Sequence, residues 1–259
     1  MPESISKGTP DEAGAASPAS CRAVPRTPVV LLPGMMCDER LFAPQRAALD
    51  EAFDVRCARF VEGESIEAFA REALECFAPS VGPLDLIGLS MGGIVAMACM
   101  AMAPERIGRV VLMDTNARAE TEQRRALRAP QIERALNGEL DTLLIEEMKP
   151  LYLAPVNRSD EALLALVLDM ARALGPEVFA RQSRALAARE DFRATLAAWR
   201  GRVHLLCGEH DALCPPARHR EMAALIGQGE PTIIADAGHL PTLEAAEVTS
   251  GALLQFLTG

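Results

Sequence analysis

Short apolar runs alternate with helical patterns along most of this chain, and this alternation constrains the possible folds more than any other feature of the sequence. Most of these runs are apolar along nearly their whole length, as in strands that are buried on both faces, whereas the run at residues 54–57 is weak. We expect strands at residues 29–32, 54–57, 84–87, 110–113, 203–207 and 232–235. Strands that alternate with helices form parallel sheets, so the sequence predicts an α/β fold with a mostly parallel sheet of about six strands flanked by helices.

The segments between these runs have the apolar spacing and the end signals of helices. We expect helices at 41–49, at 65–77 with Ser65 as N-cap, and at 91–103, where Pro104 ends the helix. Residues 117–200 contain helical patterns only, which predicts a helical insertion between two core segments, 28–116 and 201–259. Residues 1–27 are rich in Pro, Ser, Ala and Gly, and we expect them to form a flexible N-terminal tail.

Composition argues against several classes of protein. The 259 residues carry a net charge of −10 and only 4% aromatic side chains, so we expect no nucleic-acid partner. No uncharged apolar run reaches the length of a membrane span, and residues 1–27 lack the apolar stretch of a secretory signal. Seven cysteines, odd in number and without a C-x-x-C pair, are typical of reduced thiols, so we expect a cytoplasmic protein. The sequence does not indicate the oligomeric state.

The predicted strand at 84–87 runs directly into Gly88-Leu89-Ser90-Met91-Gly92-Gly93 and then into an apolar helix. A G-x-S-x-G pattern between a strand and a helix is typical of a nucleophilic serine on a sharp turn. Gly88 and Gly92 allow the backbone to approach itself more closely than side chains would permit. The alternative interpretation is that the glycines serve only strand-to-helix packing and that Ser90 caps the helix.

A serine hydroxyl needs a base, and histidine has a suitable pKa near neutrality. His239 is the best candidate, because it lies in a loop directly after the last predicted strand. His210 is a weaker alternative beside the better acid candidate. We expect His204 in the core or at a sheet edge, and His219 on a charged, solvated helix.

The base in turn needs a carboxylate to orient it. Asp211 follows the predicted strand at 203–207 and is preferred over Asp114, which follows the strand at 110–113, and over Glu209. Each of these acids could instead be a loop cap or a solvated charge.

Two backbone amides are candidates for an oxyanion hole. Met91 begins the helix after Ser90, and Met35 follows the first strand, where Gly34 lets the backbone approach a ligand. A metal site at Cys207, His210 and Cys214 can be imagined, but three loosely spaced ligands are a weak signal. We therefore expect no metal.

Four segments occur in the order and rough spacing of the α/β-hydrolase superfamily, which the chain resembles over residues 29–256. They are Leu31-Leu32-Pro33-Gly34-Met35, the Ser90 motif, Gly208-Glu209-His210-Asp211 and Ala237-Gly238-His239. The resemblance implies an α/β-hydrolase fold and a cofactor-free serine hydrolase, with residues 117–200 as a helical lid. It also implies that Ser90 is the nucleophile, His239 the base and Asp211 the acid, with the Met35 and Met91 amides as the oxyanion hole. The chain is similar to the small esterases and lactonases that include pimeloyl-carrier-protein methyl esterase and the enol-lactonases.

The chain departs from the pattern of many relatives in two places. It has Pro33-Gly34 where many have His-Gly, and it offers no antiparallel strand pair before residue 29, so we expect a reduced sheet. A serine at position 90, rather than an aspartate, argues against the haloalkane dehalogenase and epoxide hydrolase branches, which attack with a carboxylate.

These observations predict hydrolysis of a small-molecule carboxylic ester or lactone through an acyl-enzyme. Two alternatives stay open: an acyltransferase that uses the same triad, and a non-catalytic ligand-binding protein with a hydrolase fold. Four arginines at the start of the insertion raise the hypothesis that one or more of them meets an anionic group of the substrate, although a solvated helix face is the simpler interpretation. They are Arg118, Arg124, Arg125 and Arg128.

Overall fold

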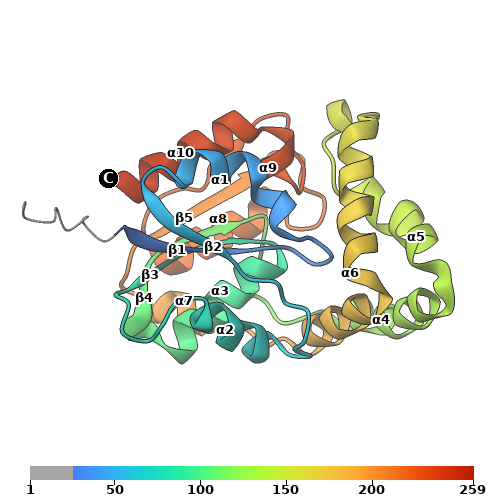
Figure 1. Cartoon of the computed structure of the whole chain (residues 1–259), viewed down its shortest axis with the longest axis horizontal. Coiled ribbons are helices and arrows are strands. Elements are labelled where there is room, and N and C mark those ends of the chain that lie inside the picture. Colours follow the sequence, from blue (N-terminus) through green and yellow to red (C-terminus); the bar gives the residue numbers. More distant parts are fainter. Residues whose placement is uncertain (1–25) are drawn as a thin grey trace, which may run out of the picture.

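Each expected apolar run forms a strand of one six-stranded parallel sheet (Figure 1). The computed structural model describes residues 26–259. The strands are β1 (Thr27–Leu32), β2 (Phe53–Cys57), β3 (Leu84–Leu89), β4 (Ile107–Met113), β5 (Val203–Gly208) and β6 (Thr232–Ile234). Their spatial order is β2-β1-β3-β4-β5-β6, and every pairing is parallel, which confirms the sheet expected from the sequence.

Burial explains why these segments become strands. β3, in the middle of the sheet, is buried along its entire length, and β1 beside it is exposed only at Thr27. β2 lies at the edge, so its pattern alternates, with Asp54 and Arg56 exposed and Val55 buried. Because of that alternation, β2 has the weakest strand signal in the sequence.

Helices cover both faces of the sheet, as Figure 1 shows. One face carries α1 (Ala43–Leu49), α9 (Pro241–Glu244) and α10 (Ala246–Thr258). The other carries α2 (Ile66–Glu75), α3 (Met91–Met102), α7 (Arg193–Ala198) and α8 (Pro216–Ile226). Ser65 caps α2 as expected, accepting a hydrogen bond from the amide of Ala68 (3.1 Å). α3 is buried almost all round, as a helix that follows a central strand must be.

A helical insertion lies between β4 and β5 and forms a separate layer at one end of the sheet (Figure 1). It contains α4 (Glu122–Arg134), the short α5 (Leu140–Leu143) and the long α6 (Glu161–Ala188), which kinks at Gly175 (φ 83°) before Pro176. A third apolar cluster joins this layer to the core through Met36, Leu143 and Phe179. α7, still within the predicted range 117–200, packs against α3 and α8.

The expected tail at residues 1–27 lies outside the described residues except for Arg26 and Thr27, and Thr27 already belongs to β1. The cysteines within residues 26–259 are all free thiols. In that same range, no helix combines the length and the hydropathy that a membrane crossing requires.

Candidate active site

Ser90 sits on a sharp turn between β3 and α3, in a backbone conformation that side chains rarely adopt (φ 55°, ψ −114°). The flanking glycines are required there, because a Cβ at Gly88 would overlap the carbonyl of Gly92, and a Cβ at Gly92 would overlap the carbonyl of Leu32. The Ser90 side chain makes no capping hydrogen bond to α3. The steric argument made from the sequence is thus confirmed, whereas Ser90 occupies the N-cap position of α3 without the side-chain bond that a capping role would supply.

The end of β4 holds this turn in place. The amide of Ser90 donates to the carbonyl of Met113 (2.9 Å), and the Thr115 hydroxyl donates to the carbonyl of Ser90 (2.8 Å). The two bonds satisfy both backbone groups of the strained residue, so the conformation is fixed by tertiary structure. No signal in the sequence pointed to Thr115, since its partner lies 25 positions away.

His239 and Asp211, which come from the loops after β6 and β5, form a buried pair. The Nδ1 atom of His239 lies 2.9 Å from Oδ2 of Asp211, and the two side chains are 3% and 0% exposed. The other Asp211 oxygen accepts the amides of Leu213 (2.8 Å) and Cys214 (3.0 Å). Because Asp211 accepts bonds at both oxygens, its carboxylate can hold the imidazole in one tautomer.

The electrostatics of Asp211 favour its charged form. Burial alone raises the pKa of this carboxyl, but the charge of His239, the hydrogen bond to its ring and the two amide hydrogen bonds more than offset that, so the pKa lies below its usual value. An ionised carboxylate beside Nδ1 is what a general base needs to stabilise the imidazolium that forms when it takes a proton.

Asp114, the alternative acid, is fully buried but pairs differently. Its Oδ1 accepts the amide of Gly208 (2.9 Å), and its Oδ2 accepts no hydrogen bond from residues 26–259, while a side-chain hydrogen bond to Asp211 is among the causes that raise its pKa. Burial raises the pKa of Asp114 well above its usual value, and the nearby charge of Asp211 raises it further. These effects favour the neutral form, so Asp114 is the poorer acid partner. Glu209, the third candidate, is exposed.

The remaining histidines lie elsewhere. His210 is partly exposed beside Glu209, and His204 is half-buried and stacks on Phe256. His219 corrects an expectation: it is fully buried, not solvated. Its neighbours Arg218 and Arg220 are half-exposed and exposed, while His219 faces inward and its Nε2 accepts the amide of Thr115 (3.3 Å). Burial lowers the pKa of His219 to about 4, so the ring is neutral.

A cavity of about 360 Å³ brings Ser90 and His239 together as lining residues. Asp211 lies behind His239 and is joined to it by the hydrogen bond above. The insertion contributes much of the apolar lining, namely Leu127, Met148, Leu151, Phe179 and Leu186. The volume falls within the range of small-molecule sites.

Met35 and Met91 also line this cavity. The Met91 amide is the first of α3, where the N–H groups of the first turn have no partner within the helix. The next amide after Met35, that of Met36, is already bound to Oε1 of Gln182 in α6 (2.8 Å). Gln182 also donates to the carbonyl of Phe60 (3.1 Å), so a residue that sequence analysis missed ties this loop to the insertion. A Cβ at Gly34 would make only ordinary contacts with protein atoms.

Within residues 26–259, one group of potential metal ligands comes close together: Asp211, Cys214 and His239, with ligand atoms within 4.8 Å of one another. It is not the set of Cys207, His210 and Cys214 considered from the sequence. Burial raises the pKa of the Cys214 thiol to about 12, and Asp211 and His239 already bind each other, so the donor set suits a hydrogen-bonded pair better than a metal.

The chain is similar to several known proteins. The model of the alpha/beta hydrolase family matches residues 29–252. A pimeloyl-[acyl-carrier protein] methyl ester esterase from Neisseria meningitidis is 25% identical over 181 residues, 68% of this chain and 70% of the relative. A thermophilic esterase from Thermogutta terrifontis has a TM-score of 0.84 at 28% identity, with 90% of each chain covered. The enol-lactonase from Burkholderia xenovorans has a TM-score of 0.80 at 25% identity, covering 92% of this chain and 94% of that one.

Proposed function

The chain belongs to the alpha/beta hydrolase family, and from this premise we propose that it hydrolyses a small carboxylic ester or lactone, with Ser90 as nucleophile, His239 as base and Asp211 as acid. One observation carries the proposal: a serine at a positive-φ turn and a histidine bonded to a buried carboxylate line the same cavity. The esterases and the lactonase among its relatives support this reaction class.

The first half of the reaction forms an acyl-enzyme. The Ser90 hydroxyl oxygen attacks the carbonyl carbon, and Nε2 of His239 takes the hydroxyl proton while Asp211 stabilises the imidazolium through Nδ1. The amides of Met35 and Met91 would donate to the oxyanion, each contributing roughly 10² to 10³ in rate. When the bond from carbon to the leaving oxygen breaks, His239 returns the proton to that oxygen, and the alcohol departs.

The second half releases the acid. A water molecule attacks the acyl carbon while His239 takes one of its protons, and the bond to the serine oxygen then breaks. His239 gives the proton back to Ser90, which restores the starting state. In this proposal residues 117–200 act as a lid whose apolar side chains hold the acyl group over Ser90 and keep bulk water out.

Labelling and turnover together test the proposal. Wild-type protein should react at Ser90 with a fluorophosphonate probe and hydrolyse short 4-nitrophenyl esters, whereas Ser90→Ala should do neither. Ser250→Ala is the matched control, because Ser250 lies in α10 and does not line the cavity. Absence of labelling in a folded wild-type protein would contradict the assignment of the nucleophile. Labelling without ester hydrolysis would favour transfer of the acyl group to an acceptor other than water.

A further inference from the structure

Charge is distributed unevenly around the cavity. Although the whole chain carries a net charge of −10, more arginines than glutamates line this cavity. The arginines are Arg118, Arg124, Arg128, Arg189 and Arg218, and the glutamates are Glu120 and Glu147. Their partners decide which of these positive charges remain available to a ligand.

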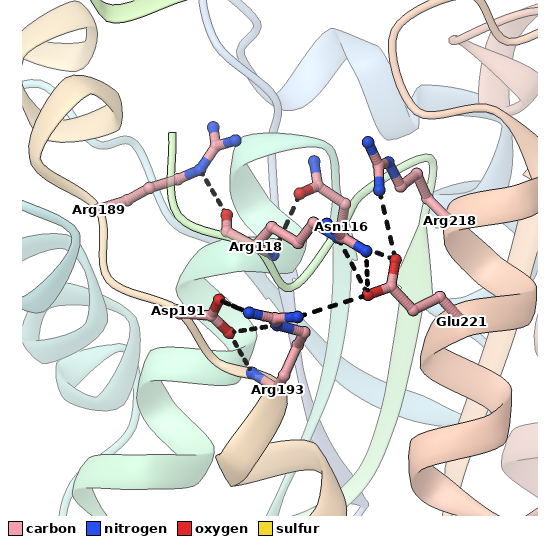
Figure 2. Close-up of polar contacts among 7 residues, drawn as sticks. All are labelled: Asn116, Arg118, Arg189, Asp191, Arg193, Arg218 and Glu221. Atoms are coloured by element: carbon pink, nitrogen blue, oxygen red, sulfur yellow. Dashed lines mark hydrogen bonds and ion pairs between the residues drawn. The ribbon is translucent and has the colours of Figure 1, made fainter. Parts of the chain in front are cut away.

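Glu221, on α8, neutralises part of the set. Figure 2 shows Arg118, Arg193 and Arg218 converging on its carboxylate, with the nearest pair, Arg118 to Glu221, at 2.8 Å. Asp191 holds Arg193 from the other side (2.6 Å). Arg118 is thus paired with Glu221 and holds the start of the insertion against α8. Among the four arginines considered in the sequence analysis, Arg118 therefore has a structural role.

Glu120 lies at the centre of a second, buried cluster. Its side chain is 0% exposed and lies between Arg128 (2.6 Å) and Arg189 (3.3 Å), which are 13% and 10% exposed. Two guanidinium charges therefore share one carboxylate in a poorly solvated wall of the cavity. Burial lowers the pKa of Arg189, and the charges of Arg128 and Arg124 act in the same direction, while Glu120 opposes them.

Donor groups in this cluster remain without strong acceptors. Nη1 of Arg128 meets only the sulfur of Met35 (3.8 Å), a weak acceptor next to the candidate oxyanion amide. Arg189 donates from Nε to the carbonyl of Arg118 (3.0 Å), whereas its Nη2 lies 3.3 Å from Oε1 of Glu120 without the geometry of a hydrogen bond. Arg124 also lines the cavity, and within residues 26–259 its guanidinium has no carboxylate partner. The fourth arginine of the sequence hypothesis, Arg125, bonds to backbone carbonyls and does not line the cavity.

We propose that Arg124, Arg128 and Arg189 form a carboxylate subsite, so that the substrate is an ester or lactone with a second, free carboxylate group. Arg128 and Arg189 are largely buried, where a charge is costly unless it is paired, and a substrate anion would supply the charge that Glu120 alone does not. Arg124 is exposed and adds a donor to the same cavity. Arginine is suited to this role because its planar guanidinium can donate two parallel hydrogen bonds to the two oxygens of a carboxylate. The inference rests on the proposed function, since it names the substrate class of the same cavity.

Two esters of equal chain length test this subsite: the 4-nitrophenyl monoester of adipic acid and 4-nitrophenyl hexanoate. We expect wild-type protein to favour the adipate ester in kcat/KM. The ratio of the two values should fall about tenfold in Arg124→Gln, in line with the loss of one charged hydrogen bond at a partly solvated site. Arg71→Gln is the matched control, because it removes the same charge from an exposed position of α2 that does not line the cavity, and it should leave the ratio unchanged.

A binding measurement separates this inference from the proposed function. Adipate should bind to Ser90→Ala protein in a calorimetric titration and bind more weakly when Arg124 is also replaced by Gln, whether or not any ester is turned over. Adipamide, which lacks the charge, should not compete with it, and tighter binding of inorganic phosphate than of adipate would assign the subsite to a phosphate group instead. Equal kcat/KM for the two esters in wild type, together with no binding of adipate, would overturn the proposal.

Discussion

Replacing Asp211 by Asn should abolish most of the activity while leaving the fold intact. One oxygen of Asp211 accepts the amides of Leu213 and Cys214, and an Asn at this position would keep those bonds by placing its carbonyl oxygen there. The amide nitrogen would then face Nδ1 of His239, where Oδ2 now lies at 2.9 Å. A donor at that position forces the imidazole proton onto Nε2, so the ring can no longer accept the proton of Ser90.

The expected loss is large because a wrong tautomer removes general-base catalysis without disturbing substrate binding. An equivalent change in serine proteases lowers kcat by about 10⁴, which corresponds to about 5 kcal/mol of transition-state stabilisation. The loss should fall on kcat, with KM nearly unchanged, since Asp211 lies behind His239 and does not line the cavity.

Asp114→Asn is the matched control, because it makes the same chemical change in a neighbouring buried carboxyl. Asp114 favours its neutral form, and an Asn can accept the Gly208 amide as Asp114 does (2.9 Å). We expect its kcat to stay within about threefold of wild type, a change of less than about 1 kcal/mol. Steady-state kinetics on a short 4-nitrophenyl ester, with circular dichroism to confirm folding, would compare the two variants.

The reasoning fails if the two variants lose similar activity, because the hydrogen bond from His239 to Asp211 would then not be what distinguishes the acids. It also fails if Asp211→Asn remains within tenfold of wild type. A large loss in Asp114→Asn alone would make that residue the acid and place it among the catalytic groups.

Three further predictions concern stability. Gly92→Ala should lower the free energy of unfolding by about 3 kcal/mol or more, because the added Cβ would overlap the Leu32 carbonyl. Gly251→Ala, in an open stretch of α10, should instead raise the free energy of unfolding by about 0.5–1 kcal/mol. Urea titration of both variants checks this, and equal effects of the two substitutions would contradict it. Ser90→Gly should be more stable than Ser90→Ala by about 1 kcal/mol in the same assay, since glycine relieves the positive φ; an Ala variant that is as stable would mean that the turn carries no strain. His219 has a pKa of about 4 in the folded chain against about 6.5 when unfolded, so the folded state binds fewer protons between these pH values. The free energy of unfolding should therefore fall by about 3 kcal/mol as the pH drops from 6.5 to 4. His219→Gln should flatten this dependence of stability on pH, and an unchanged dependence would show that other groups cause it.

The sheet could be predicted well from the sequence because most of its strands are buried on both faces, and a strand buried on both faces needs apolar residues at nearly every position. β1 and β3 show this directly. β2 gave a weaker signal, since an edge strand alternates. Strand ends were off by up to three residues: β4 begins at Ile107, where Gly108 and Arg109 interrupt the apolar run that starts at Val110.

Long-range contacts could not be predicted in the same way. The charges beside His219 suggested a solvated helix face, but the packing of α8 on the sheet turns this one residue inward. Gln182 binds the amide of Met36, which lies 146 positions away in the sequence, and no local sequence pattern could predict such a contact. The sequence did place Ser90, Asp211 and His239 at the carboxyl ends of three strands of one parallel sheet, where such sheets bring loops together.

The insertion leaves and rejoins the core at one narrow neck. The amide of Phe192 donates to the carbonyl of Ala117 (2.7 Å), and Arg118 is clamped to Glu221 of the core beside it. Beyond such a neck, doubling the length of the enclosed chain adds only about 0.6 kcal/mol of closure entropy. A shorter or longer insertion, grafted at the same two residues, would bring a different set of side chains to the cavity. It would have to keep the contacts that this one makes with the core loops, because Gln182 binds the amide of Met36 (2.8 Å) and the carbonyl of Tyr152 accepts the amide of His239 (2.7 Å).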